Sequence, residues 1–278
     1  MPELPEVETT RRGLEPHVVG KVIAAAEVRR SRMVRRQHRD RDFAERIVGR
    51  RVLGLRRHGK AILGDLDGDL TWVTHLGMSG RISVATAGSP EPPHANVVLS
   101  IKGTAEEVRF VDPRTFGYMA VFTPDELAEW PPSKWGPDAL AELPSAAKLR
   151  EVFARRSAPI KAVLLDQGVV AGLGNIYADE VLFRAKVAPT TPANVLSTEQ
   201  VAAVRKAVSP VLKAGLRHGG TSLNDLAYLL PDGRAGDYLS RLKAYGRDGE
   251  PCERCGTAIR RTVVRQRSSF WCPKCQPS

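Results

Sequence analysis

The sequence predicts an α+β protein with two domains, an N-terminal sandwich or barrel of short strands and a C-terminal helical domain that ends in a cysteine-rich hairpin. Three observations lead to this prediction. A chain of 278 residues is typical of two domains. Short apolar runs fill the first half, and the apolar period becomes helical in the second half. All four cysteines fall in the last 27 residues.

The first half is expected to form one helix and then a series of strands. The helix covers residues 3–18, where Pro5 suits the first turn and Val7 and Leu14 suit the buried side. The strands are short apolar runs bounded by Gly, Asp and Pro, and several of them alternate apolar and polar residues. Many short strands at this spacing predict a sandwich or barrel. The expected strands are Val22–Val28, Val52–Leu55, Ala61–Leu66, Thr71–Leu76, Arg81–Val84, Asn96–Ile101, Val108–Val111 and Tyr118–Phe122.

The second half is expected to be helical. Thr123 caps a short helix, and the Pro- and Trp-rich residues 131–137 read as a linker. Ser197 and Gln200 form a capping box for a long helix, with Gly215 as its C-cap, and residues 219–236 read as a loop. The expected helices are Ala146–Arg155, Ile160–Asp166, Ile176–Arg184 and Ser197–Ala214. Domains are therefore expected at residues 1–130 and 138–240, followed by a hairpin module at residues 241–278.

The charge of the chain points to a polyanionic partner. The net charge is +11 and the pI is about 9.8. Residues 11–60 hold sixteen Lys or Arg against five Asp or Glu, and residues 241–278 hold nine against three. Two basic ends suggest a cleft that grips a phosphate backbone, although an Arg-rich solvated surface would give the same counts. No apolar window is long enough for a membrane span, and the charged N-terminus does not resemble a secretory signal.

The four cysteines form two Cys-x2-Cys knuckles separated by sixteen residues, Cys252, Cys255, Cys272 and Cys275. Four thiolates in this pattern are typical of one structural Zn²⁺ site, which we favour over two disulfides because the chain lacks an export signal. Residues 259–270, between the knuckles, are expected to form an arginine-rich β-hairpin. Such a hairpin suits contact with nucleic acid, but by itself it indicates only a binding or folding module.

The first eight residues, Met-Pro-Glu-Leu-Pro-Glu-Val-Glu, admit two interpretations. Removal of Met1 would leave Pro2 with a free secondary amine, and much of an α-amino group is neutral near physiological pH. A neutral amine can attack a carbonyl-like carbon, and Glu3 or Glu6 could move protons at the same centre. The alternative is an ordinary helix start, which explains Pro5 and the acids but does not require Pro2.

Two further positions could bind phosphate. Lys60 lies between two expected strands and could clamp a phosphate or carry a proton, or it could be an edge lysine. The Gly172–Asn175 segment opens a helix, where free N–H groups bind anions and Asn175 could add a donor. The alternative for that segment is a tight turn with Asn175 as helix cap.

Met78, Arg114 and Phe116 could act together. All three fall in Gly-containing loops between expected strands. Apolar wedges and an arginine at loop tips are what a protein needs to part a base stack and fill the gap. Taken singly, Met78 and Phe116 would be read as core residues and Arg114 as a surface ion pair.

At these residues the chain closely resembles the bacterial formamidopyrimidine-DNA glycosylase family. The resemblance runs from end to end. The matching segments are 1–8, 75–80, 112–117, 172–180, 217–223 and 267–276. It implies an α+β fold in which an N-terminal β-sandwich with flanking helices is followed by a helix–two-turn–helix domain with a zinc-ribbon β-hairpin.

The resemblance also implies roles for individual residues. Pro2 would be the Schiff-base nucleophile, Glu3 its acid partner, Lys60 the acid of β-elimination, and Arg267 the residue assigned to δ-elimination. Because an arginine is a poor proton donor, we expect Arg267 chiefly to bind a phosphate beside the lesion. The positions that match DNA contacts are His94, Arg114, Arg156, Lys161 and Asn175, and those that match the void-filling trio are Met78, Arg114 and Phe116. The loop around residues 219–236 matches the segment that closes over a flipped base.

The implied function is removal of oxidised purines such as 8-oxoguanine and formamidopyrimidines from double-stranded DNA, followed by strand cleavage through β,δ-elimination. One zinc ion is the expected cofactor, and we expect a cytoplasmic, nucleoid-associated monomer with no membrane partner. Asn96 stands where a second histidine is expected near His94, and residues 235–238 differ from the usual closing loop. The alternatives are an endonuclease VIII-type enzyme for oxidised pyrimidines, which Leu4 disfavours, a non-cleaving damaged-DNA-binding module, and a zinc-ribbon transcription or RNA factor.

Overall fold

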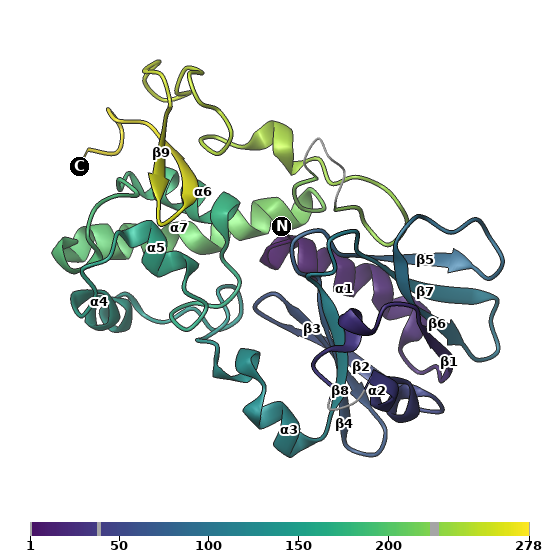
Figure 1. The fold of residues 1–278 in the computed structure, drawn as a ribbon. Helices are drawn as coiled ribbons and strands as arrows, with labels where there is room; N and C mark the ends of the chain where they lie inside the picture. Colours follow the sequence, from purple (N-terminus) through teal and green to yellow (C-terminus); the bar gives the residue numbers. More distant parts are fainter. Residues whose placement is uncertain (1, 38–39, 223–227, 278) are drawn as a thin grey trace. The chain divides into compact units, whose positions relative to one another are not determined.

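The computed structural model describes residues 2–37, 40–222 and 228–277 and divides into two compact units (Figure 1). Unit 1 comprises Met1–Lys134 and His218–Leu239, and unit 2 comprises Trp135–Arg217 and Ser240–Ser278. The first boundary falls within the expected linker. No helix within the described residues is long and apolar enough to cross a membrane.

Unit 1 contains two four-stranded antiparallel sheets, with strand orders β1-β6-β7-β5 and β2-β3-β4-β8. All eight expected strands are confirmed, with ends that differ by up to three residues. Their bounds are β1 Ile23–Val28, β2 Val52–His58, β3 Ala61–Leu66, β4 Leu70–His75, β5 Arg81–Thr86, β6 Ala95–Ile101, β7 Glu106–Val111 and β8 Tyr118–Phe122. One cluster of buried side chains contains residues from both sheets, which makes the unit a sandwich.

Two helices flank the sandwich. Helix α1 (Leu4–Val18) packs on β2 and β3 of one sheet and on β5 of the other, and its Val7 and Leu14 enter the shared core. Complete burial of such a side chain stabilises the fold by about 1.5–3 kcal/mol. Helix α2 (Asp40–Ile47) was not predicted, because only Phe43 and Ile47 mark its buried side in a short, charged sequence.

Residues 218–239 pack with unit 1, which differs from the domain boundary expected at residue 240. The physical reason is a set of hydrogen bonds to α1 and β5. The Thr221 N–H donates to Glu6 Oε1 at 2.7 Å, and the Val84 N–H donates to the Pro231 carbonyl at 3.0 Å. A Cβ added to Gly13 would lie 2.9 Å from Pro231 Cγ, so glycine allows the turn to approach α1 closely. Part of the expected closing loop, residues 223–227, lies outside the described residues.

Unit 2 is helical, as expected, with the bounds α4 Ala146–Ala154, α5 Ile160–Leu165, α6 Asn175–Ala185 and α7 Thr198–Arg217. The capping box of Ser197 and Gln200 is present. The prediction that Gly215 ends the last helix was wrong, because α7 continues to Arg217. Gly215 instead permits close packing, since a Cβ there would lie 2.5 Å from the Tyr177 hydroxyl of α6.

The hairpin predicted between the cysteine knuckles is also present, as β9 (Arg260–Val264) and β10 (Arg267–Trp271). Arg265 and Gln266 both have positive φ, which is typical of a two-residue hairpin turn. The module packs on the end of α6 through Phe183, Ala244 and Ile259. Short helices complete the chain: η1 Ser31–Val34, α3 Pro124–Glu129, η2 Pro131–Lys134, η3 Ala193–Val195 and η4 Tyr238–Arg241.

Candidate functional site

The start of α1 is fixed by buried acids. Pro2 and Glu3 are buried just before the helix, and the Glu3 N–H donates to Glu6 Oε2 at 2.8 Å. The other oxygen of Glu6 accepts the Thr221 N–H, and the Tyr228 hydroxyl donates to the Glu6 carbonyl at 3.2 Å. Glu6 therefore ties the N-terminal residues to the segment at residues 218–239. A carboxylate that accepts from both sides holds Pro2 and Glu3 in a defined place.

Lys60 lies in the same unit, at the turn between β2 and β3, where it is only 7% exposed. The following residue, Ala61, pairs with His75 of β4, which brings the lysine and the histidine into the same neighbourhood. The His75 ring stacks on Tyr118, and its Nδ1 accepts the Gly77 N–H at 3.1 Å. Burial and the nearby charges of Lys60, Arg35 and Arg36 lower the pKa of His75 to about 4. His75 is thus a neutral side chain next to a buried cation.

This histidine predicts a pH dependence of stability. It stays neutral in the folded protein down to about pH 4, whereas it is protonated near pH 6.5 when the chain is unfolded. The unfolded state therefore binds more protons between these values, so the free energy of unfolding falls as the pH drops through this window, by up to about 3 kcal/mol.

His75→Asn keeps an acceptor for Gly77 and removes the titration. Urea unfolding at pH 7 and pH 4.5 should give a smaller acid-induced loss for this variant than for wild type. Equal losses would show that other groups control the acid response.

Two loops that carry expected DNA contacts are joined by one carboxylate. Asp112 Oδ1 accepts from the Ser79 hydroxyl at 2.6 Å and from the Arg114 N–H at 3.2 Å, and its Oδ2 accepts the Gly117 N–H at 2.7 Å. The loops also touch directly, since a Cβ on Gly77, whose φ is +66°, would lie 2.4 Å from the Gly117 nitrogen. The structure thus brings together the loops of Met78, Arg114 and Phe116.

The exposed side chains of these loops have the character expected of a wedge. Phe116 is 39% exposed, although it is a large apolar residue, and the Arg114 guanidinium lies over its ring at 4.8 Å from the centroid. His94 is exposed, has a positive φ, and its carbonyl accepts the Asp112 N–H. Asn96, where a histidine was expected, is buried, and its amide donates to the Asp112 carbonyl at 2.7 Å. Asn96 therefore supports these loops from beneath.

In unit 2, the Gly-rich connector leads into α6. Gly172 has a φ of +114°, and its N–H donates to Gln167, whose amide in turn donates to the carbonyls of Leu165 and Leu173. Asn175 is the first residue of α6, and its buried Oδ1 has no hydrogen-bond partner among the described residues. The unpartnered oxygen is an acceptor, so a phosphate at this helix N-terminus would be met by the Asn175 Nδ2 group and by backbone N–H groups.

Arg156 borders a pocket of about 360 Å³ in the same unit, which Arg155, Ser157 and Arg265 also line. Its guanidinium pairs with Asp166 at 2.8 Å and remains 40% exposed. The pocket therefore joins the α4–α5 connection to the tip of the hairpin at a site rich in arginine. Such a site suits a phosphate group.

The structure corrects the expectation that Lys161 contacts DNA. Its side chain is fully buried, with the ammonium 2.8 Å from Asp179 Oδ1 and 2.7 Å from the Ser268 carbonyl. Asp179 also accepts from the Ser269 hydroxyl and the Phe270 N–H. Burial raises the pKa of Asp179 to about 6, although Lys161 and these hydrogen bonds oppose the shift. The pair fixes β10, the strand that begins with Arg267, to helices α5 and α6.

If Lys161 positions β10 and does not contact DNA, its substitution should change stability but not the salt dependence of DNA binding. Lys161→Met should lower the free energy of unfolding by about 3–5 kcal/mol, because it leaves the Asp179 carboxylate buried without its cation. The salt dependence of binding to undamaged DNA should not change, since the ammonium reaches no phosphate. Urea unfolding and binding titrations at several salt concentrations measure the two effects.

The matched control is Lys148→Met in α4, whose exposed lysine pairs with Glu151 and should change stability by less than about 0.5 kcal/mol. A flatter salt dependence for Lys161→Met at normal stability would instead assign the lysine to DNA.

Arg267 is exposed at the start of β10, where it pairs in register with Val264. Because the hairpin is held by the Lys161–Asp179 pair on one side and by the cysteine module on the other, the position of Arg267 depends on both. Pro2, Glu3 and Lys60 lie in unit 1, and Arg267, Arg156 and Asn175 lie in unit 2.

The four cysteines have the geometry of a zinc site. Their Sγ atoms all lie within 4.8 Å of one another, with separations of 3.5 Å for Cys255–Cys272, 3.5 Å for Cys255–Cys275 and 4.0 Å for Cys252–Cys275. Tetrahedral Zn–S bonds of about 2.3 Å place the sulfurs about 3.8 Å apart, so the observed cluster fits the ion. Cys252 and Cys272 are buried in the small core of the module.

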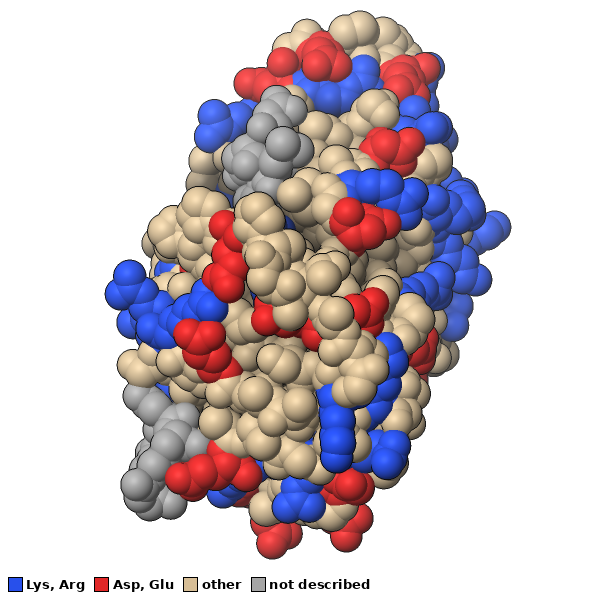
Figure 2. All heavy atoms as spheres, turned by 90° about the vertical axis from the view of Figure 1, so that its right-hand side faces the viewer, with Lys and Arg blue, Asp and Glu red and all other residues tan. Residues whose placement is uncertain are grey.

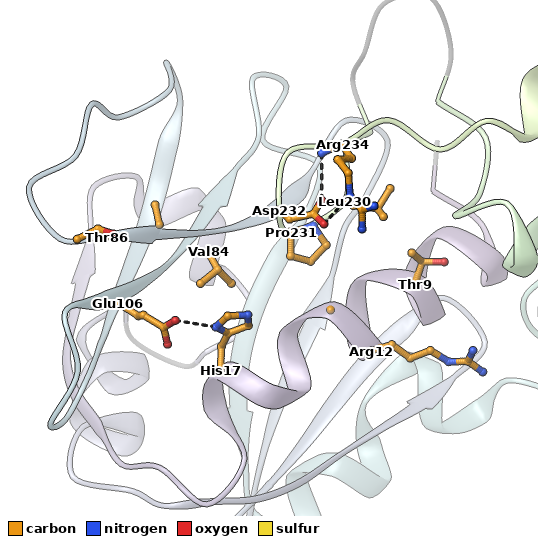
Figure 3. A pocket seen from close by; sticks show the side chains of 12 residues that line it. Thr9, Arg12, His17, Val84, Thr86, Glu106, Leu230, Pro231, Asp232 and Arg234 are labelled. Carbon is orange, nitrogen blue, oxygen red and sulfur yellow. Dashed lines mark hydrogen bonds and ion pairs between the residues drawn. The ribbon is translucent and has the colours of Figure 1, made fainter.

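Another pocket, of about 500 Å³, lies on unit 1 between α1, the β5 edge and the turn at residues 230–234 (Figure 3). None of the expected catalytic residues lines it. The view shows Pro231 above α1, a His17–Glu106 pair on the left and an Asp232–Arg234 pair beside Pro231. Figure 2 shows acidic and basic side chains mixed across the centre of one face, and basic ones gathered along its right-hand edge.

Comparison with known protein families places this architecture among DNA glycosylases. Residues 1–119 match the formamidopyrimidine-DNA glycosylase N-terminal domain, and residues 135–226 match the formamidopyrimidine-DNA glycosylase H2TH domain. Residues 249–277 match the zinc finger found in FPG and IleRS. With the sulfur geometry above, this match makes the module a zinc finger that holds one structural zinc ion.

The chain belongs to the formamidopyrimidine-DNA glycosylase family. It is 44% identical to the formamidopyrimidine-DNA glycosylase of Acidothermus cellulolyticus over all of its own length and 98% of that protein, and 41% identical to that of Geobacillus kaustophilus over 99% of its own length and all of that protein. The crystal structure of the MutM (FPG) protein from Thermus thermophilus covers 99% of this chain and 98% of that one, with 37% identity and a TM-score of 0.89. The Lactococcus lactis Fpg, in complex with an abasic site containing DNA, covers 99% of this chain and all of that one at 31% identity and a TM-score of 0.90.

Sequence reasoning missed the residues that support this site. Nothing near Asp112 in the sequence indicates its three partners, and Arg35 lies in a run of arginines that indicates only positive charge. Asp179 and Glu180 are adjacent acids flanked on both sides by apolar residues of α6, a pattern that signals buried carboxylates with partners. Glu180 accepts the N–H groups of Lys243, Ala244 and Tyr245 at 2.8–3.0 Å and so anchors the chain that leads into the zinc module.

Proposed function

We propose that the protein is a bifunctional DNA glycosylase and AP lyase of base excision repair, which removes oxidised purines such as 8-oxoguanine and formamidopyrimidines from duplex DNA. The observation that carries the proposal is the start of α1. Pro2 and Glu3 are held there by the buried Glu6, in a family member that keeps Lys60 and Arg267.

The chemistry is assigned to the α-amino group of Pro2 after Met1 is removed. Its nitrogen attacks the sugar C1′, the bond from C1′ to the base breaks, and the base leaves with a proton. Opening of the sugar ring gives an iminium, which draws electrons from C2′ once a proton is lost there. Elimination then breaks the bond from C3′ to oxygen, and a second elimination breaks the bond from C5′ to oxygen. Hydrolysis of the imine returns the free amine.

The other residues are assigned to proton transfer and binding. Glu3 is the acid partner of Pro2, and Lys60 is the acid of the first elimination, a role that suits a lysine with little exposure to water. Arg267 binds the phosphate beside the lesion during the second elimination. We also propose that His94, Arg114, Arg156 and Asn175 contact DNA, that Met78, Arg114 and Phe116 fill the gap left by the flipped base, and that Lys161 acts only by positioning β10.

We propose a division of work along the chain. The sandwich carries the nucleophile and the wedge loops, the helical domain carries Arg156 and Asn175, and the zinc finger carries Arg267. Because its substrate is chromosomal DNA, the protein is assigned to the cytoplasm, at the nucleoid, and it is expected to act as a monomer.

Incision assays test this function. Labelled duplexes with a single 8-oxoguanine, thymine glycol or abasic site are incubated with the protein, and the product ends are identified by mass. The 8-oxoguanine duplex should be cut to a one-nucleotide gap with phosphate on both sides, faster than the thymine glycol duplex.

Three other outcomes would each replace the proposal. Faster cutting at thymine glycol would favour an enzyme for oxidised pyrimidines. Binding of damaged DNA without cleavage would indicate a binding module. Equal binding of damaged and undamaged nucleic acid without cleavage would favour a zinc-ribbon binding factor.

A further inference from the structure

The backbone of the loop that carries Arg114 and Phe116 is hydrogen-bonded by two side chains of opposite charge. Asp112 binds the N–H groups of Arg114 and Gly117 on one side. On the other side, Arg35 Nη1 donates to the Gly117 carbonyl at 2.7 Å, and Nη2 donates to the Phe116 carbonyl at 2.8 Å. The loop therefore has its amides bound by an anion and its carbonyls bound by a cation.

The position of Arg35 is fixed by buried neighbours and by its own contacts. It directly follows η1, whose Met33 and Val34 are fully buried, and the side chain of the nearby Gln37 accepts the Val121 N–H of β8. The guanidinium also lies over the Tyr118 ring, 5.3 Å from its centroid, and donates to the Arg32 carbonyl at 2.7 Å. These contacts fix the orientation of the planar guanidinium fork, that is, its two N–H groups on Nη1 and Nη2. The loop carbonyls therefore accept hydrogen bonds from a group whose position is set independently of the loop.

The loop requires such support because its backbone is unfavourable. Thr115 has a φ of +51°, a left-handed conformation that costs a β-branched residue on the order of 1–3 kcal/mol. The same conformation turns the carbonyls of the following residues toward Arg35 and leaves Phe116 exposed at the tip. Loss of the fork would let the loop relax and would withdraw the aromatic ring from its exposed position.

We propose that Arg35 is a positioning residue that holds the Arg114–Phe116 loop in the shape needed to enter a DNA duplex. The inference rests on the proposed function, because it assigns the loop to the parting of stacked bases. It requires the planar fork of arginine, since a lysine ammonium keeps the charge but cannot hold two carbonyls in one plane.

The competing role for Arg35 is direct contact with a DNA phosphate, which the exposure of the residue would permit. The two roles predict different behaviour of Arg35→Lys. A phosphate contact depends mainly on charge, so lysine would keep most of it, and alanine would reduce the salt slope of binding by about one. A positioning role depends on the fork, so both variants would fail alike and the salt slope would stay constant.

The test uses the full chain and three measurements. Fluorescence of 2-aminopurine beside a tetrahydrofuran abasic analogue in a duplex reports base unstacking. Binding of undamaged duplex at several salt concentrations gives the slope. Cleavage of a single-stranded abasic oligonucleotide reports the chemistry without a duplex to open.

Arg35→Ala and Arg35→Lys should both slow unstacking by about 10-fold, the effect of losing about one hydrogen bond to a charged group. Their salt slopes and single-strand cleavage should match wild type. The matched control is Arg56→Ala, which removes an exposed arginine of the same unit that pairs with Asp65, and it should unstack DNA normally. Arg35→Ala added to Phe116→Ala should cause no further loss.

Normal unstacking by Arg35→Lys, with a reduced salt slope for Arg35→Ala, would assign the residue to phosphate and overturn the inference. Normal unstacking by both variants would overturn it as well. Wild type that neither unstacks nor cleaves would refute the proposed function itself. Wild type that does both while the variants also behave normally refutes only the role of Arg35.

Discussion

Pro2→Gly is expected to lower base excision and borohydride trapping by about 100-fold or more. Glycine leaves a primary amine, whose imine must be protonated before it becomes a good electron sink, and it removes the ring that fixes the direction of the nitrogen. Misplacement of a reacting atom by about 1 Å can by itself cost about 100-fold. The rate of excision from an 8-oxoguanine duplex and the yield of reduced conjugate measure the change.

Two matched controls distinguish loss of the Pro2 secondary amine from a change in the start of helix α1. Protein that keeps one residue in front of Pro2 has the same side chains but no secondary amine, and it should trap no DNA. Pro5→Ala keeps the amine and alters only the first turn of α1, so its trapping should stay within a few-fold of wild type. Trapping by the extended chain at the wild-type level would contradict the role of Pro2.

Removal of zinc is expected to unfold the C-terminal module and abolish cleavage. The module has a core of only a few buried residues, two of which are the ligands Cys252 and Cys272. For a segment of this size, metal binding supplies about 10–16 kcal/mol of apparent free energy, which exceeds what such a core provides. Cys272→Ser should therefore lose the ion and the hairpin, while the sandwich of unit 1 stays folded.

Metal content, thiol reactivity and circular dichroism test this independently of activity. Wild type should release one zinc per chain to a chelator, with all four thiols becoming reactive together. Added Zn²⁺ should restore the hairpin, and Mg²⁺ should not, because Mg²⁺ prefers oxygen ligands. Retention of the hairpin after the metal has been removed would show that its core alone is sufficient.

Local patterns predicted most of the elements. Short apolar runs bounded by Gly, Asp and Pro marked all eight strands, and caps such as Thr123 and Ser197 marked the starts of their helices, because both signals act within a few residues. The cysteine spacing found the zinc module for the same reason. Helix α2 was missed because Phe43 and Ile47 are the only large apolar residues in its short, charged sequence.

Contacts between residues far apart in the chain could not be predicted from local sequence patterns. Glu6 and Thr221 are 215 residues apart, and nothing near either residue shows that they meet. The same holds for Lys161, whose burial against Asp179 and Ser268 depends on the packing of the hairpin on α5 and α6. Gly215 read as a helix end, because the close approach of Tyr177 exists only in the folded protein. The sequence thus predicted which residues belong to the candidate site, but it did not predict the neighbouring side chains that fix their positions.

The most direct test of the proposed chemistry is the position of the covalent bond to DNA. Trimmed protein is trapped with borohydride on an 8-oxoguanine duplex, digested with a protease and a nuclease, and sequenced by mass spectrometry. We predict a sugar remnant on the nitrogen of Pro2, in the peptide that begins Pro-Glu-Leu-Pro. A remnant on Lys60 or another internal lysine, with Pro2 unmodified, would contradict this chemistry.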